Sequence, residues 1–319
     1  MYNFKNDYTE GCHPNILQRL LATNNDQQHG YGNDDYSNEA KDLIKRKIEN
    51  PNAEIHFVSG GTQANLIVIS ALLRSHESVI CANTGHIHVH EAGSIEATGH
   101  KINVVESSDG KIKTEDIETI LDEHSNVPHM VKPKMVYISN STEIGTIYKK
   151  SELQQLYEFC KKHDLYLFLD GARLGSALCA EDNDLTIADI AQLTDIFYIG
   201  GTKNGALLGE AIVINNDKLK EDFGFHLKQR GALIAKGRIL GIQFLELFRN
   251  DLFFELAKHA NFMAAKITSA IKEKGYTFLT NSTSNQIFPI LPNDLIAELS
   301  KKYGFYVWRK IDENNSAIR

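Results

Sequence analysis

Residues 195–214, DIFYIGGTKNGALLGEAIVI, contain the pattern that decides the fold. Two short apolar runs, 195–199 and 211–215, have the composition of buried strands, and a glycine-rich turn joins them. Lys203 lies in this turn, directly after Thr202. A lysine held at the end of a buried strand is poorly placed for a solvated surface role, and it is well placed to form a Schiff base.

A second apolar run, residues 165–169 in LYLFLDGARLG, ends at Asp170 and is followed by Arg173. A carboxylate can keep a pyridine nitrogen protonated, and the planar fork of arginine suits a substrate carboxylate. Together with the amine of Lys203, these groups match what pyridoxal phosphate requires of a protein. The alternatives are a helix N-cap for Asp170 and a structural ion pair for Arg173.

A glycine turn, SGGT at residues 59–62, lies between an apolar strand and the helical pattern QANLIVISALL. Such a turn presents backbone N–H groups and the positive end of the helix dipole, which suits a phosphate group. This turn is therefore a candidate phosphate site. By itself the motif is weak, because many strand-to-helix turns have the same composition.

The segment HIHVHEAG contains His86, His88 and His90. In a strand the three side chains would share one face, and in a helix His86 and His90 would lie one turn apart. Either geometry permits a zinc or iron site, which is one alternative. We favour hydrogen-bonded or solvated roles for His88 and His90. His86 follows a strand and a glycine, where its ring could stack on a bound cofactor.

Short β-rich runs alternate with helical patterns over most of the chain. Continuous apolar strands of this kind predict an α/β fold with a mostly parallel, seven-stranded sheet covered on both faces. The predicted strands are 54–58, 78–82, 101–106, 134–139, 165–169, 195–199 and 211–215. The predicted helices are 40–49, 63–73, 114–124, 151–163 and 187–193.

The pattern changes from about residue 232. Residues 232–274 are mostly helical, with a soft break at Asn250 and Asp251. Strand-like runs at 276–279, 286–290 and 305–308 and a helix-like run at 293–303 follow. We expect a large cofactor-binding domain with an N-terminal arm over residues 1–245 and a smaller α+β domain over 246–319. Residues 316–319 resemble the first half of a strand, in a chain that is either naturally short or truncated.

The composition of the 319 residues is that of a globular protein, and the net charge of −7 argues against nucleic acid as a partner. No apolar stretch reaches membrane-spanning length, and the N-terminus MYNFKNDYTEG is unlike a signal peptide. The cysteines form no CxxC pair, which predicts buried free thiols in a reducing cytosol. They are Cys12, Cys81, Cys160 and Cys179.

A series of segments resembles the low-specificity threonine aldolases of the β-eliminating lyase group. These are pyridoxal phosphate enzymes of the aspartate aminotransferase fold, fold type I. The segments are NDYTEGCHP, YGNDDYSNEA, FVSGGTQANL, HIHVHEAGSIEATGHK, STEIGTIY, LFLDGARLGSAL and GGTKNGALLGEAIV. The resemblance extends from the N-terminus to the last residue, and the ordered set is far more specific than any single segment.

The resemblance implies a role for each matching residue. Lys203 would carry the cofactor, Asp170 would contact its pyridine nitrogen and His86 would stack on its ring. Gly61 and Thr62 would bind its phosphate, with Thr202 nearby.

On the substrate side, the resemblance assigns Arg173 and Arg319 to the substrate carboxylate. The chain differs from many members of the group at two positions near the substrate, where Asn6 replaces a serine and Glu143 replaces a histidine. The group works as a dimer of dimers with active sites at subunit interfaces. Tyr31, and less strongly Lys236, would then serve a neighbouring subunit's site.

The predicted reaction is the cleavage of a β-hydroxy-α-amino acid, L-threonine or L-allo-threonine, to glycine and acetaldehyde. His86, directly or through a water, is the first candidate for the base that removes the β-hydroxyl proton, and Glu143 is the second. The alternatives are β-elimination or racemisation on the same cofactor, and a protein that binds this cofactor or a metal without turnover.

Overall fold

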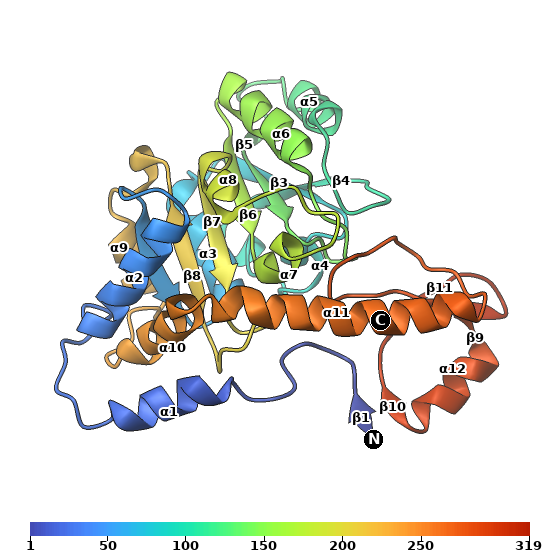
Figure 1. Ribbon diagram of the computed structural model, residues 1–319. Coiled ribbons are helices and arrows are strands. Elements are labelled where there is room, and N and C mark those ends of the chain that lie inside the picture. The colour runs from blue at the N-terminus through green and yellow to red at the C-terminus, as the bar shows by residue number, and fades with distance from the viewer.

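The computed structural model describes residues 1–319, and its centre is a seven-stranded sheet (Figure 1). The strand order is β2-β8-β7-β6-β5-β3-β4, and β8 runs in the opposite direction to the other six strands. The predicted fold class is confirmed, and all seven predicted strands are present. They are β2 (Glu54–Val58), β3 (Glu77–Ala82), β4 (Lys101–Val105), β5 (Lys132–Ser139), β6 (Tyr166–Asp170), β7 (Ile196–Gly200) and β8 (Glu210–Ile214).

Successive side chains of each strand point to opposite faces of the sheet, so the strands contribute to two hydrophobic cores. In β6, Leu167 and Leu169 pack into one core, and Phe168 between them packs into the other. The strands therefore read as continuous apolar runs, because both faces of the sheet are covered. One face is covered by α2 (Asp35–Lys47), α5 (Thr114–Glu123), α6 (Lys150–Lys162), α8 (Ile187–Gln192) and α10 (Arg238–Arg249), and the other by α3 (Gly61–Leu72) and α9 (Phe223–Gln229).

Several helices were not predicted from the sequence. They are α1 (Pro14–Ala22), α4 (His86–Val89), α7 (Leu174–Leu178) and α9. Pro14 at the first helical position is a signal that predicts the start of α1. The helices α4 and α7 are too short to show a helical period. The expected helix over 232–274 is wrong at its start, since α10 begins at Arg238, and α11 (Leu252–Glu273) begins after Asp251, whose φ is 58°.

The C-terminal part forms a small antiparallel sheet beside the far end of α11 (Figure 1). The strand expected at the end of the chain is present and lies in the middle of this sheet. Residues 276–279 form no strand and make a single bridge, between Phe278 and Pro289. The elements are β9 (Ile290–Pro292), α12 (Asn293–Ser300), β11 (Val307–Lys310) and β12 (Asn315–Ile318), while β1 (Tyr2–Asn3) pairs with β10 (Tyr303–Gly304).

None of the helices combines the length and the apolar character needed to cross a bilayer.

Candidate active site

The predicted site residues meet at the carboxyl edge of the parallel strands. Asp170 ends β6, Lys203 follows β7, and His86 follows β3. The charges of Asp170 and Lys203 both shift the pKa of His86, and the charge of Arg173 shifts the pKa of Lys203. Arg319 follows β12 of the C-terminal sheet and is close enough to Arg173 for the two charges to repel each other. Ligands of open α/β sheets bind at this edge, so the structure places the site where the fold predicts it.

The Asp170 carboxylate is buried and fully hydrogen-bonded. Oδ1 accepts from the backbone N–H of Ala172, at 3.0 Å, and from the hydroxyl of Tyr198. Oδ2 accepts from the hydroxyl of Tyr137 at 2.5 Å and from Nδ2 of Asn65 at 3.2 Å. Burial and the nearby Asp170 charge raise the pKa of both tyrosines far above the ordinary value, so they remain donors. Four donors and no cation hold this carboxylate.

Lys203 has a free amine. Its Nζ makes no hydrogen bond or ion pair within the chain. Burial, and then the charge of Arg173, lowers the pKa of Lys203, although nearby carboxylates oppose the shift. Burial raises the pKa of its neighbour Glu210 to about 8, while Oε2 of Glu210 accepts from the N–H of Gly201 at 2.9 Å. A lysine with a lowered pKa has more neutral amine and is a better nucleophile.

Arg173 is gripped by a carboxylate that sequence reasoning missed. Its Nε and Nη2 donate to Asp7 at 2.7 and 3.0 Å, so Asp7 occupies the side-on edge of the guanidinium. Asn285 donates to the same carboxylate at 2.9 Å. Burial alone would raise the pKa of Asp7, but the charge and hydrogen bonds of Arg173 hold it below its ordinary value. Nη1 of Arg173 makes no hydrogen bond within the chain, so the end-on edge remains available to a second carboxylate.

Arg319 faces the same region as Arg173. Its guanidinium lies 5.4 Å from the ring centre of Tyr306 and 5.1 Å from that of Trp308, and Nη2 donates to the carbonyl of Lys5 at 3.3 Å. Burial and the like charge of Arg173 lower the pKa of Arg319. A carboxylate bound between the two arginines would relieve this repulsion.

Two predicted residues use their polar atoms locally. Oδ1 of Asn6 accepts from the N–H of Tyr8 at 3.2 Å and from the hydroxyl of Thr9 at 2.8 Å, and so holds a turn of the N-terminal arm. The hydroxyl oxygen of Thr202 accepts from the N–H of Gly209 at 2.9 Å and closes the turn that carries the lysine.

The predicted phosphate site is an uncapped helix end. Gly60 caps α3 without a side-chain hydrogen bond, so the first N–H groups of this helix point outward. A Cβ atom at Gly61 would lie 3.0 Å from the hydroxyl oxygen of Tyr198, which itself donates to Asp170. Tyr198 therefore contacts both the helix end and the carboxylate. This arrangement fits a ligand with a phosphate at one end and a protonated ring nitrogen at the other.

His86 makes two contacts through different atoms. Its backbone N–H donates to Oε1 of Glu143 at 3.0 Å, and that oxygen also accepts from the hydroxyl of Ser139 at 2.6 Å. Burial raises the pKa of the Glu143 carboxyl. The ring nitrogen Nδ1 of His86 lies 2.8 Å from Oε1 of Glu91, a buried residue that sequence reasoning missed although HIHVHEAG contains it. The two candidate bases, His86 and Glu143, are thus joined through the backbone N–H of His86.

The other histidines of this segment do not complete a metal site. His90 lies 5.6 Å from His86, between ring centres, and 6.4 Å from Trp308, while His88 is exposed. No group of three or more His, Cys, Asp or Glu side chains comes together in the chain in a way that could hold a metal ion.

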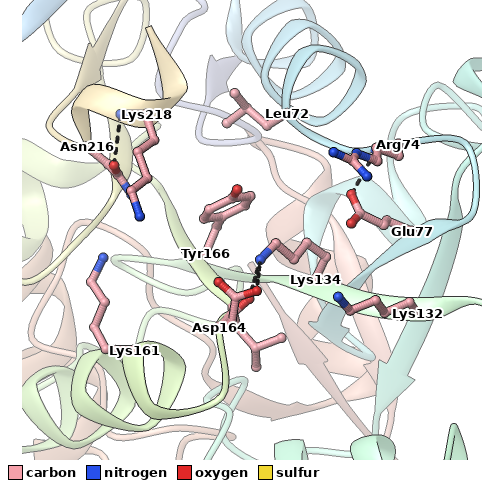
Figure 2. A pocket seen from close by; sticks show the side chains of 11 residues that line it. Leu72, Arg74, Glu77, Lys132, Lys134, Lys161, Asp164, Tyr166, Asn216 and Lys218 are labelled. Atoms are coloured by element: carbon pink, nitrogen blue, oxygen red, sulfur yellow. Dashed lines mark hydrogen bonds and ion pairs between the residues drawn. The ribbon is translucent and has the colours of Figure 1, made fainter.

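A cavity of about 490 Å³ lies at the opposite, amino edge of the sheet (Figure 2). Lys134 forms an ion pair with Asp164 there at 2.7 Å, and Lys161 forms one with Asp195 at 2.5 Å. This basic cavity contains none of the predicted site residues. Its cationic residues are Arg74, Lys132, Lys134, Lys161 and Lys218.

Comparison with known proteins agrees with the geometry. The family model described as beta-eliminating lyase matches residues 4–292. The low specificity L-threonine aldolase of Pseudomonas sp. (strain NCIMB 10558) is 32% identical over 314 residues, which cover 96% of this chain and 89% of that protein. The solved structure of Leishmania major threonine aldolase is 50% identical with a TM-score of 0.98, over 100% of this chain and 93% of that one.

A more distant structure supports the fold alone. A single mutant of Thermus thermophilus aspartate aminotransferase is 14% identical and has a TM-score of 0.72, over 96% of this chain and 83% of its own. The family match confirms the predicted enzyme class, a lyase, and the predicted cofactor, pyridoxal phosphate. The chain therefore belongs to the β-eliminating lyase family.

Proposed function

We propose that this chain is an aldolase that cleaves L-threonine or L-allo-threonine into glycine and acetaldehyde. The observation that carries the proposal is the charge of Arg173 near the free amine of Lys203, with Arg319 near Arg173 in turn. Two cations next to a cofactor-binding lysine suit an α-amino acid, whose carboxylate they would hold. The relatives named as threonine aldolases support the choice of reaction.

In this proposal each part of the cofactor has a protein partner. Lys203 would hold it covalently, Asp170 would contact the ring nitrogen, and His86 would cover the ring. Gly61 and Thr62 would bind the phosphate through the end of α3, with Thr202 shaping the adjoining turn. When bound, pyridoxal phosphate supplies an electron sink for the bond that breaks.

The side chains would divide the remaining work. Arg173 and Arg319 orient the substrate carboxylate, so that the Cα–Cβ bond is held in one direction. Asn6, on the arm beside them, borders the same region. The ring nitrogen Nε2 of His86 accepts the β-hydroxyl proton, either directly or through water, and Glu143 is the second candidate. The Cα–Cβ bond breaks, acetaldehyde leaves, and a proton returned to Cα gives glycine, which balances the atoms of threonine.

The reaction is tested by its products. The holoenzyme incubated with L-threonine should form glycine and acetaldehyde in equal amounts, measured by amino-acid analysis and by coupling acetaldehyde to alcohol dehydrogenase. 2-Oxobutyrate and ammonia would instead identify an eliminase, and D-threonine or D-allo-threonine a racemase. Parallel assays with L-allo-threonine decide which β-configuration is preferred.

Arg173→Lys should raise KM for L-threonine and lower kcat/KM by about 10- to 100-fold, the loss of one charge-assisted hydrogen bond. Lysine keeps the charge but cannot hold Asp7 on one edge and the substrate on another. Steady-state kinetics measure the effect. Arg249→Lys is the matched control, because Arg249 pairs with Glu39 and Glu246 on the surface. Unchanged kinetics in Arg173→Lys would refute the proposed arginine clamp, which is the binding of the substrate carboxylate by Arg173 together with Arg319.

The proposal includes a homo-oligomer and the predicted two-domain division. Tyr31 and Lys236 are exposed, which leaves both side chains available to a second subunit. Arg319, from residues 246–319, would close the site formed by residues 1–245. Four unpaired cysteines support a cytosolic location. Sedimentation velocity tests the assembly, and a monomeric holoenzyme would refute it.

A further inference from the structure

Glu91 is a buried carboxylate with three donors and no cation. Its side chain is 0% exposed, and it lies just after α4. Oε1 accepts from Nδ1 of His86 at 2.8 Å and from Nδ2 of Asn65 at 2.7 Å, while Oε2 accepts from the hydroxyl of Ser94 at 2.8 Å. An ionised carboxylate is destabilising in a protein interior unless such hydrogen bonds compensate it. Its position therefore depends on the groups that it contacts.

The contact with Glu91 fixes the state of the His86 ring. A carboxylate only accepts hydrogen bonds, so Nδ1 of His86 must carry the hydrogen. In the neutral ring, Nε2 is then the nitrogen with a free lone pair. Burial would lower the pKa of His86, but the hydrogen bond to Glu91 and the charges of Asp170 and Glu91 raise it above its ordinary value. The ionisable groups around this ring are Glu91, Asp170, Glu143, His90 and Lys203.

Asn65 joins this pair to the carboxylate at the end of β6. It is fully buried on α3, and its Nδ2 donates one hydrogen to Glu91 and the other to Oδ2 of Asp170, at 3.2 Å. The amide cannot be reversed, because its oxygen would then face two carboxylates. In the observed orientation Oδ1 is buried without a hydrogen-bond partner. The chain tolerates an unsatisfied acceptor here, which indicates that the bridging nitrogen serves a purpose other than packing.

We propose that Glu91 and Asn65 are positioning residues for the reaction. Glu91 holds the His86 ring with Nδ1 protonated and Nε2 directed at the substrate hydroxyl. Asn65 ties this pair to Asp170, so that the proton acceptor and the carboxylate that would contact the cofactor's ring nitrogen belong to one hydrogen-bonded frame. The catalytic part of this inference rests on the proposed function, whereas the state of the His86 ring does not.

Glu91→Gln tests the first half of the inference in two independent ways. In the cofactor-free protein, the pKa of His86 should fall by about one unit or more, because the charged partner is lost. Imidazole NMR signals report the titration, and His86→Phe identifies the signal among the 13 histidines. In the holoenzyme, kcat should fall about 10- to 100-fold with KM little changed, since the arginine clamp is untouched. The acid limb of the pH profile of kcat should move to lower pH.

The controls separate positioning from folding. Glu77→Gln is the matched variant, because Glu77 is equally buried but lies at the opposite edge of the sheet, where it accepts from the N–H of Arg74. It should leave both the His86 titration and the turnover unchanged. Glu91→Asp keeps the negative charge but moves it farther from the His86 ring, because the side chain is one methylene shorter. The pKa of His86 in this variant should therefore lie between the values in the wild type and in Glu91→Gln. If Glu91→Gln fails to fold, a His86 pKa in Glu91→Asp below that of the wild type is the deciding result.

The bridge is tested by Asn65→Ala. Its loss of kcat should be smaller when Glu91→Gln is already present than in the wild type, because both changes break the same chain of contacts. Additive losses would overturn the proposed frame, and an unchanged His86 titration in a folded Glu91 variant would overturn the role of Glu91. If the titration shifts but the wild-type enzyme does not cleave threonine, the ring assignment stands and the proposed function fails.

Discussion

Replacing Lys203 with alanine should lower turnover of L-threonine by at least about 10⁴-fold, because the covalent link to the cofactor and the amine that exchanges with the substrate are both lost. The structure gives the reason for choosing this lysine. Its Nζ makes no hydrogen bond or ion pair in the chain, and burial lowers its pKa. Borohydride reduction of the wild-type holoenzyme, followed by digestion and mass spectrometry, should place the pyridoxyl group on Lys203.

Lys134→Ala is the control for this experiment. Lys134 is also buried, but it pairs with Asp164 at the amino edge of the sheet, and so its replacement should leave the activity of the folded enzyme unchanged. A pyridoxyl group on any other lysine, or substantial turnover in Lys203→Ala, would show that the cofactor is attached elsewhere.

The sequence predicts the sheet well because its signal is local. Each strand is a short run of β-branched and aromatic residues, and each ends in a polar residue or a glycine turn. Asp170 and Lys203 are recognisable for the same reason, because a charged side chain at or near the end of a buried strand is unusual. The edge at which they meet follows from the parallel arrangement of the strands. The fold class, and the meeting of Asp170 and Lys203 at this edge, were therefore predictable from the sequence.

The partners of these residues were out of reach because they are distant in sequence. Asp7 grips Arg173 across 166 residues, and Asn65 reaches Asp170 across 105. No periodicity or local motif encodes such a pair. Asn6 illustrates the same limit: the resemblance indicates position 6, while the structure shows that its neighbour Asp7 makes the ion pair.

Short elements were missed for a different reason. The helix α4 has four residues and begins at His86, so the spacing of its histidines is compatible with both a strand and a helix. Gly85 precedes this helix at a place where the backbone is closely packed, since a Cβ atom there would lie 3.0 Å from the carbonyl oxygen of Ala82. Only the packed structure reveals this close approach and the contact between the His86 ring and Glu91.

Asp170→Asn should leave the cofactor bound but lower kcat by more than about 10³-fold. The carboxylate accepts from Asn65, Tyr137 and Tyr198, and an amide cannot accept at both atoms, so one of its ends would face donors only. The change removes the negative charge that would keep the cofactor's ring nitrogen protonated, and with it the electron sink for the breaking bond.

Turnover is measured with L-threonine and cofactor content by the absorption of the holoprotein. Asp195→Asn provides the comparison, because Asp195 is equally buried but pairs with Lys161 far from the site. That variant should lose stability in thermal unfolding while the folded enzyme keeps its turnover. Asp170→Asn should show the opposite pattern, a large loss of turnover in a folded, cofactor-loaded protein. Near-normal turnover in that state would mean that Asp170 only maintains the tyrosine and asparagine contacts around it, and the electron sink would have to be controlled by another group.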